Sequence, residues 1–198
     1  KEGRVRDDPL PNLESYNAAT DRRHDRRALR INELRALLES ARTGPVRYGV
    51  CGEDRVLLYT VAVETGLRAN ELRTLTVSSF DFESTPPKVI VRAAYSKHRR
   101  EDVLPLRPET AQRIREHVQL KAPMALAFKV PERTSRMVRE DLEAAGIPYR
   151  DKRGRYADFH ALRHTFVTNL ANSGVHPRTA MKLARHSDPT LTLSTYTH

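Results

Sequence analysis

Hydrophobic positions along most of the chain recur every three to four residues, which is the period of an α-helix. Two glycines, Gly66 and Gly146, are placed to end helices, because glycine readily adopts the left-handed conformation of a helix C-terminus. The pattern predicts a first helix that starts at residue 32 and ends before a loop at 44–52. Further helices are predicted over 53–65, 68–75, about 109–121, 133–145, about 159–172 and 177–185. A last helix is predicted to start at Asp188 and to carry Tyr196.

The period changes between residues 76 and 107, where apolar positions suit extended chain. Three short strands are predicted, over 77–82, 88–94 and 102–106. Turns at 84–87 and 96–100, rich in proline and in polar residues respectively, separate them. The expected fold is therefore mainly α with a small three-stranded antiparallel sheet, an α+β arrangement.

The first 29 residues differ from the rest of the chain. They are polar, hold two prolines, and include the charged run from Asp21 to Arg27. We expect residues 1–29 to be a basic arm or linker, either a solvated tail, a strap along DNA phosphates, or the stub of a preceding domain. Residues 30–198 are expected to form one folded domain, which is long enough to bury a good core.

Charge narrows the choice of partner. The chain has 35 Lys and Arg against 25 Asp and Glu, a formal net charge of +10 and a pI of about 10.1. Residues 88–115 alone carry eight basic and three acidic side chains. This balance favours nucleic acid over a membrane as the partner, and no apolar run reaches the roughly 18 residues of a membrane helix. The single Cys51 allows no internal disulfide and suits a reducing cytoplasm.

Candidate chemistry lies in the last 39 residues. His160, Arg163 and His164 are spaced so that a helix presents them on one face. An arginine fixed in this way offers a planar set of donors that stays charged at any working pH, which a phosphate site requires. The adjacent apolar stripe that would anchor the helix is Phe159, Leu162, Phe166 and Leu170.

This segment has two other interpretations. The spacing of His160 and His164 is that of a zinc-binding pair, but Ala161 supplies no general base and Arg163 would repel a cation, so no metal is expected. The side chains could also merely decorate a helix surface. That alternative weakens once Arg68, His186 and Tyr196 are added in order.

The order of these motifs resembles the tyrosine recombinase, or phage integrase, family. The segments that carry the resemblance are Thr65-Gly-Leu-Arg-Ala-Asn-Glu-Leu72, His160-Ala-Leu-Arg-His164, Ala184-Arg-His-Ser187 and Thr195-Tyr-Thr-His198. It covers roughly residues 30–198 and implies the catalytic-domain fold of that family, without an amino-terminal core-binding domain. Family members usually carry a further helix after the tyrosine, which docks on a neighbouring protomer.

The resemblance also implies catalytic roles. Arg68 and Arg163 would clamp the non-bridging oxygens of the scissile phosphate, and Tyr196 would attack it to form a 3′-phosphotyrosine. Elementary chemistry agrees, because a free tyrosine has a pKa near 10 and needs a base or cations to attack at neutral pH. Arginines provide the charge stabilisation that a metal would otherwise give.

The remaining site residues follow from the same resemblance. Lys97 would protonate the leaving 5′ oxygen, His160 would take the tyrosine proton, and His186 would donate a hydrogen bond to the phosphate. Glu71 is expected to support the arginines rather than to act as a catalyst.

Some assignments compete with others. Lys88 is an alternative to Lys97, and Tyr95 and Tyr156 are alternatives to Tyr196. Expected phosphate contacts of the DNA are Arg99, Arg100 and Arg185. The last of these stands where the family usually has glycine, which would alter the loop or add a contact.

The expected function is that of a site-specific recombinase, an integrase of a mobile element in the bacterial cytoplasm, associated with the nucleoid. Its expected partner is double-stranded DNA, on which it would self-associate into a tetramer, with no cofactor, metal, ATP, membrane or small-molecule substrate. The alternatives are a type IB topoisomerase and an inactive DNA-binding relative.

Overall fold

The computed structural model describes residues 24–95 and 100–196. These residues form eight α-helices, one 3₁₀ turn and a three-stranded sheet. The helices are α1 (Ile31–Thr43), α2 (Gly52–Thr65), α3 (Ala69–Thr74), α4 (Pro108–Val118), α5 (Thr134–Ala144), α6 (Ala161–Asn172), α7 (Pro177–Ala184) and α8 (Thr190–Tyr196). The α+β class predicted from the sequence is confirmed.

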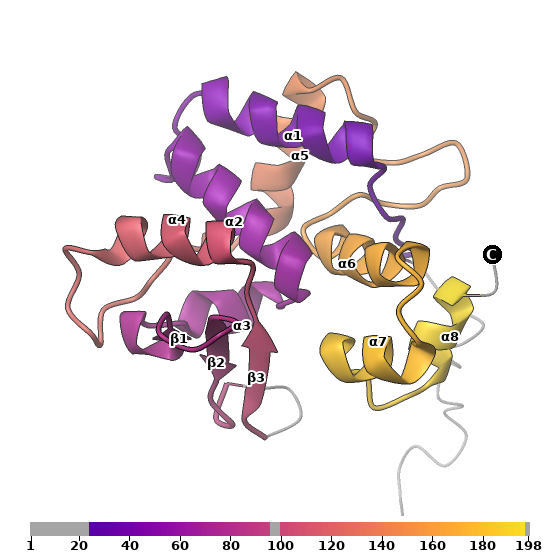
Figure 1. Cartoon of the computed structure of the whole chain (residues 1–198). Coiled ribbons are helices and arrows are strands. Elements are labelled where there is room, and N and C mark those ends of the chain that lie inside the picture. The colour runs from indigo at the N-terminus through magenta and orange to yellow at the C-terminus, as the bar shows by residue number, and fades with distance from the viewer. Residues whose placement is uncertain (1–23, 96–99, 197–198) are drawn as a thin grey trace, which may run out of the picture.

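Helix α2 is the centre of the fold (Figure 1) and packs against α1, α4 and α6. It is buried on nearly all sides, from Arg55 to Thr65, which explains why its sequence is apolar all round. Gly66 ends it with φ of 64°, as the sequence predicts. A side chain at this position would also collide with the ring of Phe166, because an added Cβ would lie 2.5 Å from that ring.

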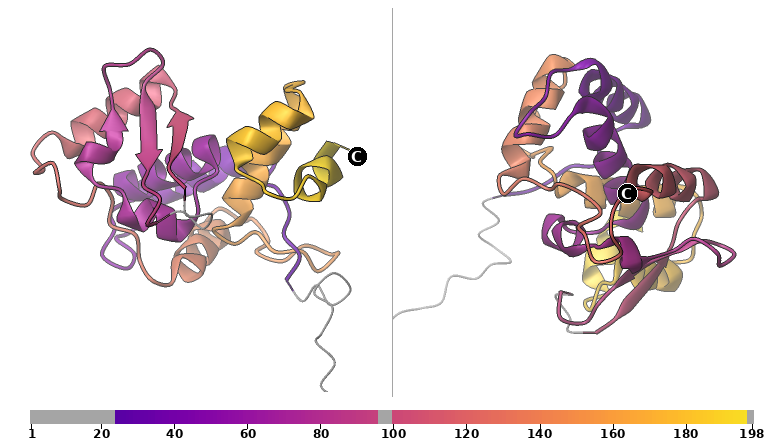
Figure 2. Two further views of the ribbon diagram at one scale, coloured as in Figure 1. Left: turned by 90° about the horizontal axis from the view of Figure 1, so that it is seen from below. Right: turned by 90° about the vertical axis from the view of Figure 1, so that its left-hand side faces the viewer.

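The small sheet lies at one side of α2, and α6, α7 and α8 lie at the other (Figure 2). Its strands β1 (Phe80–Asp81), β2 (Lys88–Val91) and β3 (Asp102–Pro105) are antiparallel in the order β1-β2-β3. In the register, Phe80 pairs with Val89, and Val91 pairs with Asp102. The first strand is shorter than predicted, because Val77–Ser79 form a 3₁₀ turn.

Alternation along β3 places Asp102 and Leu104 on its buried side and exposes Val103 and Pro105. Leu104 belongs to the main hydrophobic core, whereas Asp102 is a carboxylate that is only 7% exposed. The buried side of this strand therefore places the carboxylate of Asp102 in the interior of the protein.

The segment just before α1 is packed against the body of the protein. The ring of His24 stacks on Tyr156 with centroids 4.0 Å apart, and Arg26 pairs with Asp158 at 2.8 Å. The backbone N–H of Leu29 donates to Thr165 Oγ1, and Leu29 itself is buried. The folded unit therefore includes residues 24–29, which the sequence analysis had placed in the arm.

Candidate active site

Four of the expected catalytic residues line one small cleft, of about 260 Å³. They come from the start of α3, the start of α6 and the loop between α7 and α8. The lining consists of Arg68, His160, Arg163, His164, Val167, His186, Leu191 and Thr195. The three residues of the His160–His164 run share this face, as their helical spacing predicts.

Arg163 is held by the main chain. Its side chain is buried, with Nη1 donating to the carbonyl of Gly66 and Nη2 to the carbonyl of Ala184. Burial, followed by the nearby charges of Arg68 and Arg185, lowers the pKa of Arg163 to about 9. The guanidinium is therefore still charged at neutral pH, and an anion in the cleft would relieve the repulsion among these cations.

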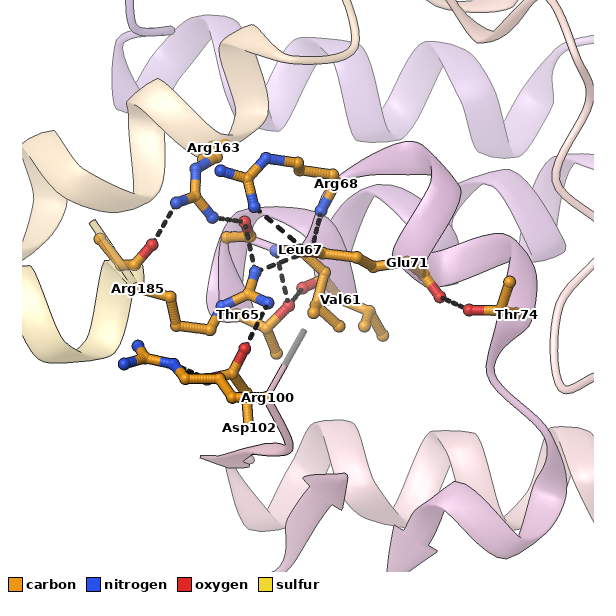
Figure 3. Close-up of polar contacts among 12 residues, drawn as sticks. Val61, Thr65, Leu67, Arg68, Glu71, Thr74, Arg100, Asp102, Arg163 and Arg185 are labelled. Atoms are coloured by element: carbon orange, nitrogen blue, oxygen red, sulfur yellow. Dashed lines mark hydrogen bonds and ion pairs between the residues drawn. The ribbon is translucent and has the colours of Figure 1, made fainter. Parts of the chain in front are cut away.

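Arg68 immediately precedes α3 and reaches the same cleft (Figure 3). Its Nη1 donates to Glu71 Oε1 at 3.1 Å, and its backbone N–H donates to Glu71 Oε2 at 2.8 Å. About a quarter of the side chain is exposed. Glu71 thus fixes both the main chain and the side chain of Arg68, while the guanidinium remains open to the cleft.

His160 stands one residue before α6. The Asp158 carboxylate accepts a hydrogen bond from the Ala161 N–H at 3.0 Å, so the helix starts two residues later than the predicted 159. Burial, then the neighbouring His164 and Arg26, lowers the pKa of His160 to about 3. The imidazole is neutral at working pH, and a ring nitrogen can accept a proton or a hydrogen bond.

His186 follows α7 and faces the cleft from the other side. Its Nδ1 lies 2.9 Å from Thr192 Oγ1 of α8, which orients the ring. Burial, then the charges of Arg163 and Arg68, lowers the pKa of His186 to about 4.

Tyr196 lies apart from these residues. It is the last residue of α8, and its hydroxyl donates to the Val175 carbonyl at 2.6 Å, in the loop between α6 and α7. Tyr196 is not among the residues that line the cleft in the described part of the chain. Burial raises the pKa of the Tyr196 hydroxyl. The expected nucleophile is thus in the right region of the fold, but its oxygen points to a backbone carbonyl.

The other tyrosines and lysines considered from the sequence lie elsewhere. Tyr156 stacks on His24, Tyr95 is about half exposed near the end of β2, and Lys88 pairs with Pro105 inside the sheet. Lys97 and Arg99 lie outside the described residues.

The expected DNA contacts differ in exposure. The side chain of Arg100 is 59% exposed and donates to Asp102 Oδ1 at 3.1 Å. Arg185 is only 2% exposed and pairs with Glu71 Oε2 at 2.8 Å and with Asp102 Oδ2 at 3.5 Å. In this structure the guanidinium of Arg185 faces two buried carboxylates instead of solvent, so its expected contact with DNA stays a prediction.

Asp102 was not singled out by the sequence analysis. The signal was available in the alternation of β3, since a strand that buries Leu104 also turns the residue two positions earlier inward. No cluster of three or more His, Cys, Asp or Glu that suits a metal ion is found within 24–95 and 100–196. Over the same residues, every helix is too short or too polar to cross a membrane.

Comparison with known proteins finds a matching family and several similar proteins. The family model described as the phage integrase family matches residues 27–198. The chain is 29% identical over 143 residues to the tyrosine recombinase XerA of Saccharolobus solfataricus, covering 72% of this chain and 45% of that protein. It is 27% identical over 174 residues to a tyrosine recombinase of Pseudothermotoga lettingae, covering 84% of this chain and 54% of that protein. The chain therefore spans about half the length of these relatives.

Solved structures share the fold. The integrase of the Tn1549 transposon, in complex with transposon right-end DNA, matches with a TM-score of 0.70 at 20% identity, over 89% of this chain and 63% of that one. The catalytic domain of bacteriophage HP1 integrase matches with a TM-score of 0.63 at 20% identity, over 88% of each chain.

Proposed function

The chain belongs to the phage integrase family of tyrosine recombinases, and from this we propose that it cleaves and rejoins DNA strands at specific sites through a covalent 3′-phosphotyrosine. The observation that carries the proposal is the convergence of Arg68, Arg163, His160 and His186 on one cleft. Two guanidinium groups and two neutral imidazoles in one small space suit a phosphodiester better than any other common ligand.

The two arginines would bind the scissile phosphate. A guanidinium has five N–H donors, and the bonds to Gly66 and Ala184 engage two of those of Arg163, which leaves others for phosphate oxygens. As the phosphorus becomes pentacoordinate, charge develops on the non-bridging oxygens, and fixed donors stabilise it. No metal or ATP is needed for this step, because the arginines supply the positive charge and religation reverses the cleavage.

The cleavage step moves one proton on each side of the phosphorus. Tyr196 Oη would attack, the bond from phosphorus to the 5′ oxygen would break, and the phenol proton would pass to His160. The pKa of a free phenol is about 10, and burial raises that of Tyr196 further, so the phenol is protonated near neutral pH and a base is required. Lys97, outside the described residues, would give a proton to the leaving 5′ oxygen.

Tyr196 must first release the Val175 carbonyl. A single hydrogen bond of this kind contributes about 0.5–1.5 kcal/mol net, so its loss lowers the attacking population by a factor of only about 2 to 13. Contacts with DNA or with a second protomer would readily offset that. The docked tyrosine therefore agrees with a nucleophile that is delivered when the substrate is bound.

The proposed partner is double-stranded DNA, within a bacterial nucleoid, and strand exchange would take place in a tetramer. Solved relatives support DNA as the partner, since they include the Tn1549 integrase with transposon DNA and the XerH recombinase bound to its difH substrate. The net charge of +10 supports it independently.

The proposal is tested with nicked duplexes that trap a covalent intermediate, prepared from the DNA that flanks the gene. The protein is incubated with them in the presence of a metal chelator and examined on a denaturing gel. We expect an adduct that Tyr196→Phe abolishes and that the matched control Tyr95→Phe retains. Arg68→Ala should slow its formation about 10²- to 10³-fold, as the loss of one transition-state donor does elsewhere.

Other outcomes point to other functions. An adduct that survives Tyr196→Phe would exclude this residue as the nucleophile. Relaxation of any supercoiled plasmid by the monomer, with no requirement for a specific site, would favour a type IB topoisomerase. DNA binding without an adduct on any substrate would favour an inactive DNA-binding relative.

A further inference from the structure

Arg185 occupies an unusual position in the backbone. It is the residue between α7 and His186, and its φ of 56° lies in the left-handed region that favours glycine. A non-glycine residue there is strained, so its side chain needs a compensating role. That side chain is among the largest in the protein that are fully buried.

The buried guanidinium joins two acidic residues from distant parts of the chain. Arg185 Nη2 donates to Glu71 Oε2 at 2.8 Å, and Nη1 lies 3.5 Å from Asp102 Oδ2. The other oxygen of each carboxylate pairs with an arginine of the site region: Glu71 Oε1 with Arg68, and Asp102 Oδ1 with Arg100. Figure 3 shows this chain of five charged side chains.

The sequence positions of these groups show what the contacts connect. Glu71 lies in α3, which begins just after Arg68, and Asp102 begins β3. Arg185 itself immediately precedes His186. One side chain therefore links the three segments that carry Arg68, Arg100 and His186, and these segments are far apart in sequence.

We propose that Arg185 is a positioning residue for DNA cleavage, which holds Glu71 and Asp102 so that the α3 start, β3 and the His186 loop keep one fixed geometry. This inference rests on the proposed function for the reaction that it serves. Arg185 would act through Glu71 and Arg68 and would not touch the phosphate itself.

Charge balance explains why removal of Arg185 would disturb the site. The charged groups that interact with Glu71 are Arg68 of the α3 start, Arg163 of α6 and Arg185 after α7. Next to these lie His186, Asp102 of β3 and Arg100. Hydrogen bonding to Arg185 is the first of the effects that hold the pKa of Glu71 below its usual range, against the opposing effect of burial. Without Arg185, this nearly fully buried carboxylate would keep Arg68 as its one direct partner among residues 24–95 and 100–196.

The test compares Arg185→Met, which removes the charge but fills the space, with Arg185→Lys, which keeps a charge that cannot reach both carboxylates in the same way. Thermal unfolding is measured at about pH 5 and about pH 7.5. We expect the midpoint temperature of unfolding to fall further below that of the unaltered protein at pH 7.5 than at pH 5 in Arg185→Met, because Glu71 must ionise at the higher pH without its partner. Arg185→Lys should lose less, and Arg185→Met combined with Glu71→Gln should recover at least half of the loss at pH 7.5.

A second measurement separates positioning from a direct DNA contact. Each phosphate contact contributes about 0.9 to the slope of log affinity against log salt concentration. We expect this slope to be unchanged in Arg185→Met, while adduct formation on nicked DNA slows at least tenfold and is partly rescued by Arg185→Lys.

Each outcome is decisive. A midpoint loss that is equal at both pH values, or not recovered by Glu71→Gln, overturns the proposal. A salt slope smaller by about 0.9 restores Arg185 as a phosphate contact and overturns it as well. If the unaltered protein forms no adduct, the proposed function fails by itself, whereas the unfolding and salt measurements still decide whether Arg185 acts through Glu71. If the Met variant does not fold, Arg185→Lys is measured in the same way, and a loss independent of pH overturns the proposal.

Discussion

Replacement of His160 by glutamine should make the protein less sensitive to acid. In the folded protein the pKa of His160 is about 3, because the ring is largely buried and lies beside other cations. In the unfolded chain the pKa is about 6.5. The pKa is lowered on folding, so this group stabilises the fold fully above about pH 6.5 and loses that contribution progressively as the pH falls toward 3.

The magnitude follows from the two pKa values. At pH 5 an unfolded chain binds a proton at this position almost completely, and the folded protein binds hardly any. Proton uptake then stabilises the unfolded state by RT ln(1 + 10^1.5), or about 2 kcal/mol, relative to pH 7.5. That is a substantial part of a typical unfolding free energy of about 5–15 kcal/mol. His160→Gln should not show this loss, because glutamine does not titrate.

The assay is urea unfolding of the wild type and His160→Gln at about pH 5 and about pH 7.5. The free energy of unfolding should fall between these pH values by about 2 kcal/mol more in the wild type than in the variant. All other titrating groups contribute equally to both proteins and cancel. An equal fall in both proteins, or an NMR titration of the His160 ring with a midpoint near 6.5, would refute the reasoning, because folding would then not lower the pKa of this imidazole.

Three further predictions concern the fold and the DNA interface. Gly66→Ala should destabilise the protein by about 1–3 kcal/mol more than Gly146→Ala in thermal unfolding, because both glycines have positive φ but only the first would push a Cβ into an aromatic ring; equal losses would contradict this. Tyr59→Phe removes a 2.7 Å hydrogen bond to the buried carboxylate of Asp141 and should lower the free energy of unfolding in urea by about 1.5–3 kcal/mol. The control Tyr48→Phe, at the exposed carboxylate of Glu140, should change it by less than about 0.5 kcal/mol. Arg100→Gln should lower the salt slope of DNA binding by about 0.9, and an unchanged slope would remove this residue from the interface.

The local features of the fold were predictable because they depend on nearby residues. The helical period located α2, and Gly66 marked its end to the residue. The change to a period of two located β2 and β3 to within a few residues. The motif order brought Arg68 and Arg163 to one cleft, although 94 residues lie between them in the chain.

The features that were missed depend on distant pairs. A basic residue beside His186 suggested contact with DNA, and nothing near it in sequence reveals its partners Glu71 and Asp102. The direction of the Tyr196 hydroxyl depends on how α8 packs beside the α6–α7 loop, which no local pattern specifies. The packing of residues 24–29 was missed because their partners Tyr156, Asp158 and Thr165 lie more than 120 residues away.

The two carbonyls that hold Arg163 have a consequence for how the sequence can diverge. Both acceptors, at Gly66 and Ala184, belong to the main chain, which is present whatever side chain stands at those positions. Mutation can therefore change most of the surroundings without removing either acceptor, provided that the backbone path survives. A change that shifts the chain around the arginine should therefore disturb it more than a change of a neighbouring side chain.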